Sequence, residues 1–306
     1  MKVFYSSDYV AAAESFDTTR KSGWIADSLS ASPIEGLEII APRPLEFDEI
    51  ATVHSPAYVT AVQTGEPRSL AESQGFTWDP GLWRSVVAST GGVVAAALEA
   101  MSTGVTGSLS GGLHHARYDT GSGFCTFNGL AIAAKAALDS GAESVLILDV
   151  DAHCGGGTHS LIKDDARIRQ IDVSVCSFDS YQVSGDNTFD LVKTADDYLA
   201  TIERRLSEME RDGWKPSLCL YNSGMDPDER CVIGGLSGIS DSILSEREKM
   251  VFEWFSSRRI PVAFVLAGGY SGPRLPCDEL VALHRMTIES ASSLAGWATK
   301  SEEQFI

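Results

Sequence analysis

The chain has 306 residues, of which 43% are hydrophobic and 22% charged, and this composition excludes a disordered, collagen-like or disulfide-stapled protein. Its formal net charge of -18 argues against a nucleic-acid-binding protein, because contacts to phosphates need a basic surface. We therefore expect a globular protein whose acidic surface favours solubility and permits a cationic substrate.

The N-terminus and the cysteines indicate a compartment. Residues 1–8 turn polar too soon for a signal peptide, and no uninterrupted apolar run approaches the length of about eighteen residues that suggests a membrane-spanning helix. The six cysteines form no CxxC pair and have no regular spacing, which is typical of free thiols. These features predict a cytoplasmic protein without a membrane helix. They leave open whether copies of the chain associate into a homo-oligomer.

Short apolar runs rich in β-branched residues alternate with longer helical segments. In chain order, the expected helices and strands are helix 82–102, helix 127–140, strand 144–149, strand 168–174, helix 190–212, strand 217–221, helix 241–258, strand 261–266 and helix 276–297. Nearly unbroken hydrophobicity is typical of parallel strands that are covered by helices on both faces. The alternation predicts one doubly wound α/β domain over residues 1–306, with a mainly parallel central sheet.

Polar side chains follow three of the predicted strands. Asp149, Asp151 and His153 come at the end of the strand expected over 144–149. Asp226 follows the strand expected over 217–221, and Tyr270 follows the strand expected over 261–266. Ligands of such sheets bind outside the carboxyl ends of the strands. The sequence therefore predicts that these side chains share one cleft.

The first group has the composition of a metal site. Asp149, Asp151 and His153 alternate along the chain, so in an extended segment they face one side. Buried carboxylates and imidazoles are costly unless they are paired or bound to a metal. With Asp226 the group offers oxygen, nitrogen and oxygen ligands, and three protein ligands with one open position are typical of catalytic zinc. A hydrogen-bonded network of buried polar groups is the alternative.

A second candidate site contains two adjacent histidines, His114 and His115, within a glycine-rich segment. Adjacent side chains in an extended strand point to opposite sides, so both reach one cleft only from an irregular loop, which glycines allow. Histidine titrates near neutrality, and the two residues are candidates for acid–base catalysis. Two unrelated surface histidines are the alternative.

These motifs resemble the zinc-dependent histone deacetylase family, which includes acetylpolyamine amidohydrolases and acetoin-utilisation proteins. The matching segments, in the order of the family, are Leu-His-His-Ala at 113–116, Ser-Gly-Phe-Cys-Thr-Phe-Asn at 122–128 and Leu-Asp-Val-Asp-Ala-His at 148–153. Segments 51–59, 224–226 and 266–270 add support. The resemblance implies the arginase-deacetylase fold and an enzyme that removes an acetyl or other acyl group from an acetylated amine, such as acetyl-lysine or an acetylpolyamine.

The resemblance also implies the metal ions. Asp151, His153 and Asp226 match the ligands of one Zn²⁺ per chain. Ser174 matches the serine of a structural K⁺ site that uses the backbone of residues 149–153.

For catalysis, the resemblance implies that His114 and His115 transfer protons and that Asp149 orients His114. Tyr270 matches the tyrosine that hydrogen-bonds the scissile carbonyl.

For substrate binding, Gly123 and Phe124 match the wall of the narrow acyl-lysine tunnel. Asp79 occupies the place of a rim carboxylate that holds the substrate backbone in some members, but an N-cap before Pro80 is the favoured interpretation.

Three segments depart from the family pattern. Cys154 replaces a histidine, residues 16–21 match a His-Pro-Glu-Arg segment poorly, and Gly156 stands where relatives carry the Asp or Asn that orients the second tandem histidine. Water or a carboxylate from elsewhere in the chain can fill this place; if nothing charged does, we expect His115 to be less basic than in relatives that carry Asp there. Gly156→Asp is then expected to shift the acidic limb of the pH–rate profile upward.

The sequence disfavours two other functions. A two-metal ureohydrolase of the arginase type needs an aspartate at Gly155 and further aspartates around Asp226, and neither requirement is met in the pattern of that family, so a second metal lacks ligands. A non-catalytic acyl-amide-binding protein is disfavoured because all the matched catalytic residues are present. The remaining histidines, His54, His159 and His284, are expected to be structural or ordinary, His54 because it precedes a helix start at Ser55-Pro56.

Overall fold

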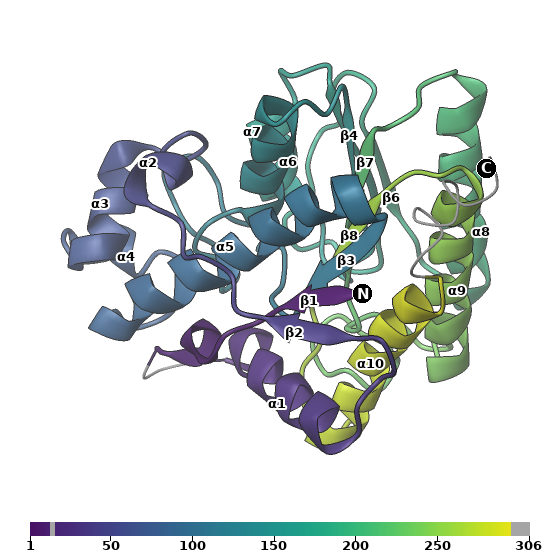
Figure 1. Ribbon diagram of the computed structural model, residues 1–306, viewed down its shortest axis with the longest axis horizontal. Coiled ribbons are helices and arrows are strands. Elements are labelled where there is room, and N and C mark those ends of the chain that lie inside the picture. Colours follow the sequence, from purple (N-terminus) through teal and green to yellow (C-terminus); the bar gives the residue numbers. More distant parts are fainter. Residues whose placement is uncertain (13–15, 295–306) are drawn as a thin grey trace, which may run out of the picture.

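A central parallel sheet of eight strands organises the computed structural model, which describes residues 1–12 and 16–294 (Figure 1). The strand order is β2-β1-β3-β8-β7-β4-β5-β6, and every neighbouring pair is parallel. The strands are β1 (Lys2–Phe4), β2 (Glu38–Ile40), β3 (Val105–Ser108), β4 (Val145–Asp149), β5 (Ile168–Ser174), β6 (Thr188–Leu191), β7 (Leu218–Ser223) and β8 (Val262–Leu266). The predicted parallel α/β sheet is confirmed.

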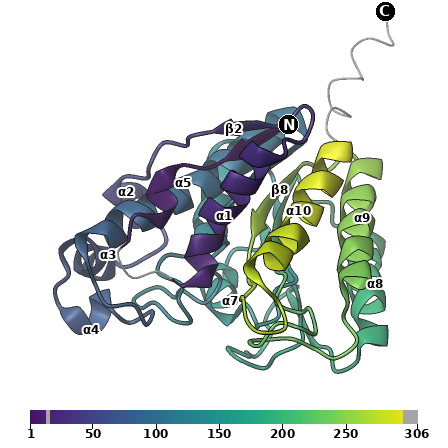
Figure 2. The same cartoon turned by 90° about the horizontal axis from the view of Figure 1, so that it is seen from below.

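Helices cover both faces of the sheet. One face carries α1 (Asp17–Ala31), α8 (Ala195–Arg211), α9 (Asp241–Ser257) and α10 (Cys277–Ser293), with α9 and α10 side by side (Figure 2). The other face carries α2 (Phe47–Ile50), α3 (Pro56–Thr64), α4 (Arg68–Ala71), α5 (Pro80–Thr103), α6 (Gly129–Asp139) and α7 (Gly156–Ile162). The last three residues of the helix expected over 276–297, and residues 13–15 and 295–306 of the predicted domain, lie outside the described residues.

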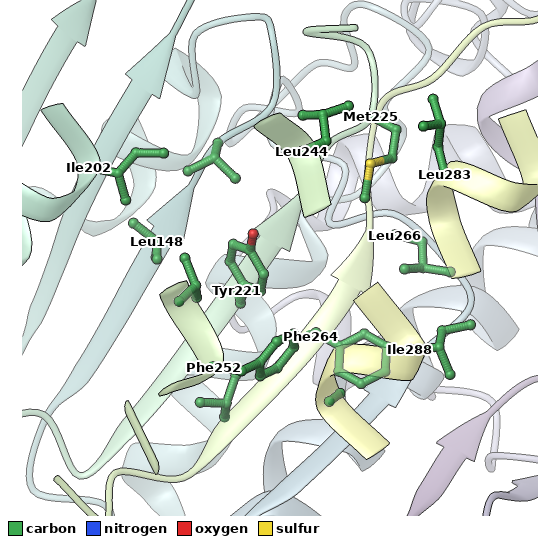
Figure 3. Close-up of a cluster of buried hydrophobic side chains, with 14 of the residues drawn as sticks. Leu148, Ile202, Tyr221, Met225, Leu244, Phe252, Phe264, Leu266, Leu283 and Ile288 are labelled. Carbon is green, nitrogen blue, oxygen red and sulfur yellow. The ribbon is translucent and has the colours of Figure 1, made fainter. Parts of the chain in front are cut away.

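Strand β4 shows why the predicted strands are almost entirely hydrophobic. Leu146 and Leu148 belong to the core beneath α1, α8, α9 and α10, whereas Val145 and Ile147 belong to the core on the opposite face. Alternate residues of a strand point to opposite faces, so a sheet covered on both sides needs apolar residues at nearly every position. Figure 3 shows the first of these cores, where Leu148 and Phe264 from the sheet lie among side chains of the covering helices.

Two helices begin at the residues that the sequence predicted. The Asp79 carboxylate accepts a hydrogen bond from the Gly81 amide (2.6 Å), with Pro80 in the first turn of α5. The Ser55 hydroxyl accepts a hydrogen bond from the Tyr58 amide (3.1 Å) at the start of α3. These contacts satisfy amide groups that have no partner within the helix. The N-cap interpretation of Asp79 is confirmed.

Helix α5 is long and apolar enough, by length and composition, to cross a membrane, although the criterion of uninterrupted apolar residues did not detect it. Its most apolar window has a mean hydropathy of 1.3, and 61% of that window is buried within the fold. The helix packs against β3 and α6. A buried core helix passes the same test, so its composition is explained by this packing.

Candidate active site

The order of the strands brings the predicted site residues together. β8, β7 and β4 are neighbours in the sheet, and the segments that carry Tyr270, Asp226 and Asp151 follow their carboxyl ends. All three side chains are buried, and Asp151 and Tyr270 line the same cavity. The geometry expected from the strand ends is therefore present, on the side of the sheet where ligands of α/β folds bind.

Asp151, His153 and Asp226 form a tight group. The Nδ1 atom of His153 lies 3.1 Å from Asp151 Oδ1 and 3.0 Å from Asp226 Oδ2. Backbone amides fix both carboxylates, because Ala152 donates to Asp226 Oδ1 (3.0 Å) and Gly268 donates to Asp151 Oδ2 (2.7 Å). A side chain at Gly268 would overlap the Asp226 carboxylate. The local backbone is thus built around the positions of these two carboxylates.

The donor set and its electrostatics fit a zinc ion. The three ligand atoms lie within 4.8 Å of one another, and the buried Asp226 Oδ2 has no hydrogen-bond partner among the described residues apart from its 3.0 Å contact with His153 Nδ1. Burial lowers the pKa of His153, but hydrogen bonds to Asp151 and Asp226 outweigh this effect and raise it to about 11. The group therefore favours a positive charge, as a cation site must. Among the described residues it is the one such cluster, so the second metal of a ureohydrolase has no ligand group there.

The tandem histidines lie in an irregular loop beside this group. His114 Nδ1 lies 2.7 Å from Asp149 Oδ2, and His114 Nε2 lies 3.1 Å from His115 Nε2. Burial lowers the pKa of His114, but the carboxylates of Asp149 and Asp151 raise it to about 10. The loop is held by Asn128, whose Nδ2 donates to the His114 carbonyl at 3.2 Å. Both imidazoles consequently reach one cleft, as the glycines on either side allow.

A carboxylate from elsewhere in the chain partners His115, which is one of the two alternatives that the sequence left open. The His115 Nδ1 atom lies 3.0 Å from Oδ2 of Asp179, which belongs to the loop after β5. The pKa of His115 is lowered to about 4 by burial and by the charge of His114, and the contact with Asp179 opposes this shift. Gly156 lies against Asp179, so the place of the expected side chain is occupied by another part of the chain. Cys154, the other departure in this segment, donates its thiol to the carbonyl of Cys176 (3.2 Å).

Aromatic rings border the tandem histidines and the metal-site group. Phe124, which has a positive φ of 64°, stacks on Phe16 with ring centroids 4.5 Å apart. Phe178 meets the ring of His115 edge-on at 4.9 Å. Gly123 lies between these elements, because a Cβ atom there would be 2.6 Å from the His115 ring and 3.1 Å from Phe178. Sequence reasoning identified Gly123 and Phe124 but missed Phe178, whose surroundings in the chain carry no motif.

Tyr270 lies close to the metal-site group, although it is far from His153 in the sequence. Its ring centroid is 6.3 Å from that of His153 and 5.4 Å from that of Phe16. Burial, together with the charges of Asp226 and Asp151, raises the pKa of Tyr270 well above its ordinary value. The hydroxyl therefore stays protonated near neutral pH and can act as a hydrogen-bond donor.

Lys21 is another residue of the site that the sequence did not indicate. Its fully buried ammonium donates to the carbonyl of Ala267, just after β8. Burial lowers the pKa of Lys21 to about 8, against the opposing charges of Asp226 and Asp151. It lines the cavity of the tandem histidines, which has a volume of about 30 Å³. Residues 16–21, the segment that matched the family poorly, thus place a cation at the site.

Ser174, at the end of β5, lies beneath the metal-site group. Its hydroxyl donates to the carbonyl of His153 (3.2 Å) and contacts the carboxylate of Asp172. Burial and the neighbouring Asp149 raise the pKa of Asp172 to about 8. A hydroxyl, a backbone carbonyl and a buried carboxylate are hard oxygen ligands of the kind that an alkali cation prefers.

Comparisons with known proteins agree with this geometry. The model of the histone deacetylase domain matches residues 16–280. An uncharacterized protein of Picosynechococcus sp. is 32% identical over 243 residues, which cover 78% of this chain and 80% of the relative. Histone deacetylase 2 of Arabidopsis thaliana is 26% identical over 308 residues, which cover 93% of this chain and 79% of the relative.

A solved structure shows the same fold. The acetylpolyamine aminohydrolase from Burkholderia pseudomallei superimposes with a TM-score of 0.76 at 17% sequence identity, over 97% of this chain and 100% of that chain. Together with the match of the family model over most of the sequence, this confirms the resemblance seen in the motifs. The chain therefore belongs to the histone deacetylase family, whose members are hydrolases that act on acetylated amines.

Proposed function

We propose that this protein is a zinc-dependent amidohydrolase that removes an acetyl group from an acetylated primary amine. The observation that carries the proposal is the arrangement of Asp151, His153 and Asp226 beside the tandem histidines and the Tyr270 side chain. A non-catalytic acyl-amide-binding protein would need neither two buried, carboxylate-paired imidazoles nor a phenol kept protonated beside the same cavity.

In this proposal one zinc ion per chain would be held by the side chains of Asp151, His153 and Asp226. When bound, zinc would polarise the amide carbonyl and lower the pKa of a water molecule to about 7. The chain holds the two carboxylates in place through the amides of Ala152 and Gly268. The buried Oδ2 atom of Asp226 supports a missing ligand contact, because His153 Nδ1 at 3.0 Å is its one close polar neighbour among the described residues.

The tandem histidines transfer the protons. His115 is neutral near pH 7, because its pKa is lowered to about 4 by burial and by His114, so it can accept a proton from water. Asp149 keeps the neighbouring His114 charged, since the pKa of His114, despite burial, is raised to about 10. As the water molecule loses this proton, its oxygen bonds to the carbonyl carbon. The accepted proton then goes to the amide nitrogen as the carbon–nitrogen bond breaks, and the amine and acetate leave.

Tyr270 donates a hydrogen bond to the oxygen of the former carbonyl group as negative charge develops on it. Such a donor typically contributes about 2.7–4 kcal/mol to stabilisation of the transition state. Its glycine-rich neighbourhood, Gly268-Gly269-Tyr270, follows a fully buried strand, so the phenol is carried on a short segment anchored to the sheet.

The rings of Phe124 and Phe178 suit the alkyl stem of an acylated amine. Acetyl-lysine and acetylpolyamines share this stem, and the acidic chain, with its net charge of -18, would attract a cationic polyamine or a basic peptide.

We also propose a structural K⁺ at Ser174 with the backbone carbonyl of His153. A cytoplasmic location is proposed as well, in keeping with the six unpaired cysteines, all within the described residues.

The proposal is tested by assaying zinc-reconstituted protein on a panel of acetylated amines, with acetyl-lysine peptides and acetylpolyamines as two arms. We expect release of acetate from at least one arm. As matched variants, Asp226→Asn should abolish turnover, while Asp228→Asn, which changes a buried carboxylate bound to Arg230, should retain it. Binding of the panel without acetate release would support the non-catalytic alternative instead.

A further inference from the structure

Asp179 reaches the second tandem histidine from a part of the chain that carries no recognised motif. Its Oδ2 atom lies 3.0 Å from His115 Nδ1, and the two side chains are only 8% and 6% exposed. The residues are 64 positions apart in the sequence. A buried imidazole that contacts a carboxylate through one nitrogen has its tautomer fixed by that contact.

Two further groups hold the Asp179 carboxylate in this position. The Gly157 amide donates to the same Oδ2 atom at 3.0 Å, and the Arg117 guanidinium pairs with Oδ1. Asp179 itself has a positive φ of 60°, a conformation that is uncommon for residues other than glycine and is tolerated by Asp and Asn. The loop is therefore shaped so that this one side chain turns inward to His115.

Gly156 provides the space for this arrangement. A Cβ atom at Gly156 would overlap the carbonyl oxygen of Asp179 and would lie 2.8 Å from Asp179 Oδ1. The φ of Gly156 is not in the left-handed region, so its backbone conformation does not require glycine. The requirement comes from the loop: a side chain at 156 and the carboxylate of Asp179 exclude each other.

We propose that Asp179 is the positioning residue for His115 and that Gly156 is the space its loop needs, an inference that rests on the proton-transfer role proposed above. With Nδ1–H donated to Asp179, the Nε2 atom of His115 faces His114 and the cavity without its own proton. The carboxylate also stabilises the imidazolium that forms when Nε2 accepts a proton. The carboxylate that orients His115 thus comes from the loop after β5, whereas the family resemblance places it at position 156, at the start of α7.

A purely structural role for Asp179, as the partner of Arg117 and of the Gly157 amide, makes different predictions. In Asp179→Asn, one side of the amide must turn its NH₂ group toward either Arg117 or His115. The charged Arg117 guanidinium repels an NH₂ group more strongly than the neutral Gly157 amide on the other side does. The NH₂ group therefore faces His115 and donates to its Nδ1 atom, and the ring then carries its proton on Nε2. Arg117→Leu removes the ion pair and leaves the contact between Asp179 and His115 intact.

The experiment measures the tautomer of His115 by ¹⁵N NMR of the zinc-loaded protein, with the signal assigned by its loss in His115→Ala. We expect the Nδ1–H tautomer in the native protein and in Arg117→Leu, and the Nε2–H tautomer in Asp179→Asn. On the substrate found in the panel, kcat of Asp179→Asn should fall by roughly 10²-fold or more with KM little changed, and more than that of Arg117→Leu.

Gly156→Ala tests the same relationship with Asp179 chemically intact, should Asp179→Asn fail to fold. Its methyl group should displace the loop and give the same change of tautomer, whereas Gly23→Ala, where the nearest atom is 3.6 Å away, should change nothing. An Nδ1–H tautomer and native kcat in folded Asp179→Asn would overturn the inference. Because the tautomer is read without substrate, absence of turnover in the native protein would refute the proposed function and leave this test standing.

Discussion

The Nε2 atom of His114 lies 3.1 Å from the Nε2 atom of His115, and the Nδ1 atom of each ring faces its own carboxylate. In the resting pair one proton lies between these two atoms, because two protonated Nε2 atoms at this distance repel each other. Burial opposes the charge on both rings, yet the carboxylates beside His114 raise its pKa to about 10, while His114 helps lower that of His115 to about 4. Opposite shifts of neighbouring groups are how enzymes assign acid and base roles.

The first prediction concerns the pH dependence of this pair. A general base is active in its unprotonated form, so a lowered pKa extends activity to lower pH. Because burial and His114 lower the pKa of His115 to about 4, the acidic limb of kcat/KM should lie below pH 6.5. The measurement is kcat/KM between pH 5 and 8, with zinc content determined at each pH, since protonated ligands release metal. An acidic limb above pH 6.5 in zinc-loaded protein would contradict it.

The second prediction concerns the Tyr270 hydroxyl. Tyr270→Phe should lower kcat by about 10²–10³-fold, because it removes one donor to the developing oxyanion. The zinc content should not change, since no ligand is altered. Tyr118→Phe serves as the control, because it removes the hydroxyl of an exposed tyrosine (56% exposed). Native kcat in Tyr270→Phe would show that the hydroxyl has no catalytic part.

The third prediction concerns the metal ligands. Asp226→Ala should lose zinc without unfolding, because burial and the charge of Asp151 already raise the pKa of Asp226, and removing its carboxylate relieves that repulsion. Elemental analysis gives the zinc content, and circular dichroism monitors folding. Retention of one tightly bound zinc in the variant would exclude Asp226 as a ligand.

The fourth prediction concerns stability at low pH. His54 is fully buried, with Nδ1 2.8 Å from the Arg117 carbonyl and Nε2 accepting from the Asn128 amide at 2.9 Å. Burial lowers its pKa to about 4. Between pH 6.5 and 4 the unfolded chain binds more protons at this site than the folded chain, so the stability contributed by neutral His54 is full above pH 6.5 and falls with decreasing pH.

The expected loss through His54 is about 3 kcal/mol over that interval, at about 1.4 kcal/mol for each unit of pKa difference. Urea unfolding at pH 7 and pH 5 measures the part of this loss that falls above pH 5, about 2 kcal/mol, and His54→Gln, which removes the titrating group, should show a smaller loss. The same decrease in both proteins would show that His54 does not contribute to acid sensitivity.

The strands that the sequence predicted are those with a recognisable apolar run. β4 and β8 are apolar at nearly every position, β7 begins with four apolar residues and β5 keeps three, and their predicted bounds agree with the structure within two residues. β1 and β2 have three residues each, and β3 reads Val-Thr-Gly-Ser, so none offers a sufficiently long hydrophobic run. These strands form through pairing with neighbours distant in the sequence, which composition alone does not reveal.

The same distinction applies to the site. Asp151, His153, Asp226 and Tyr270 follow predicted strands, so the topology of the sheet was enough to place them together. Asp179 lies in a loop that has no regular structure, and its inward direction depends on a positive φ and on the space at Gly156. Such contacts depend on the tertiary packing of that loop, and no local pattern in the sequence encodes them.

The central claim is that one zinc ion, bound by Asp151, His153 and Asp226, makes this protein a deacetylase. The most direct measurement adds zinc stepwise to metal-free protein and follows acetate release from the best acetylated amine in the panel. We expect activity to rise linearly and to stop rising at one zinc per chain, with no activity at any zinc concentration in Asp226→Ala. Full activity in metal-free protein, or a requirement for two zinc ions per chain, would contradict the claim.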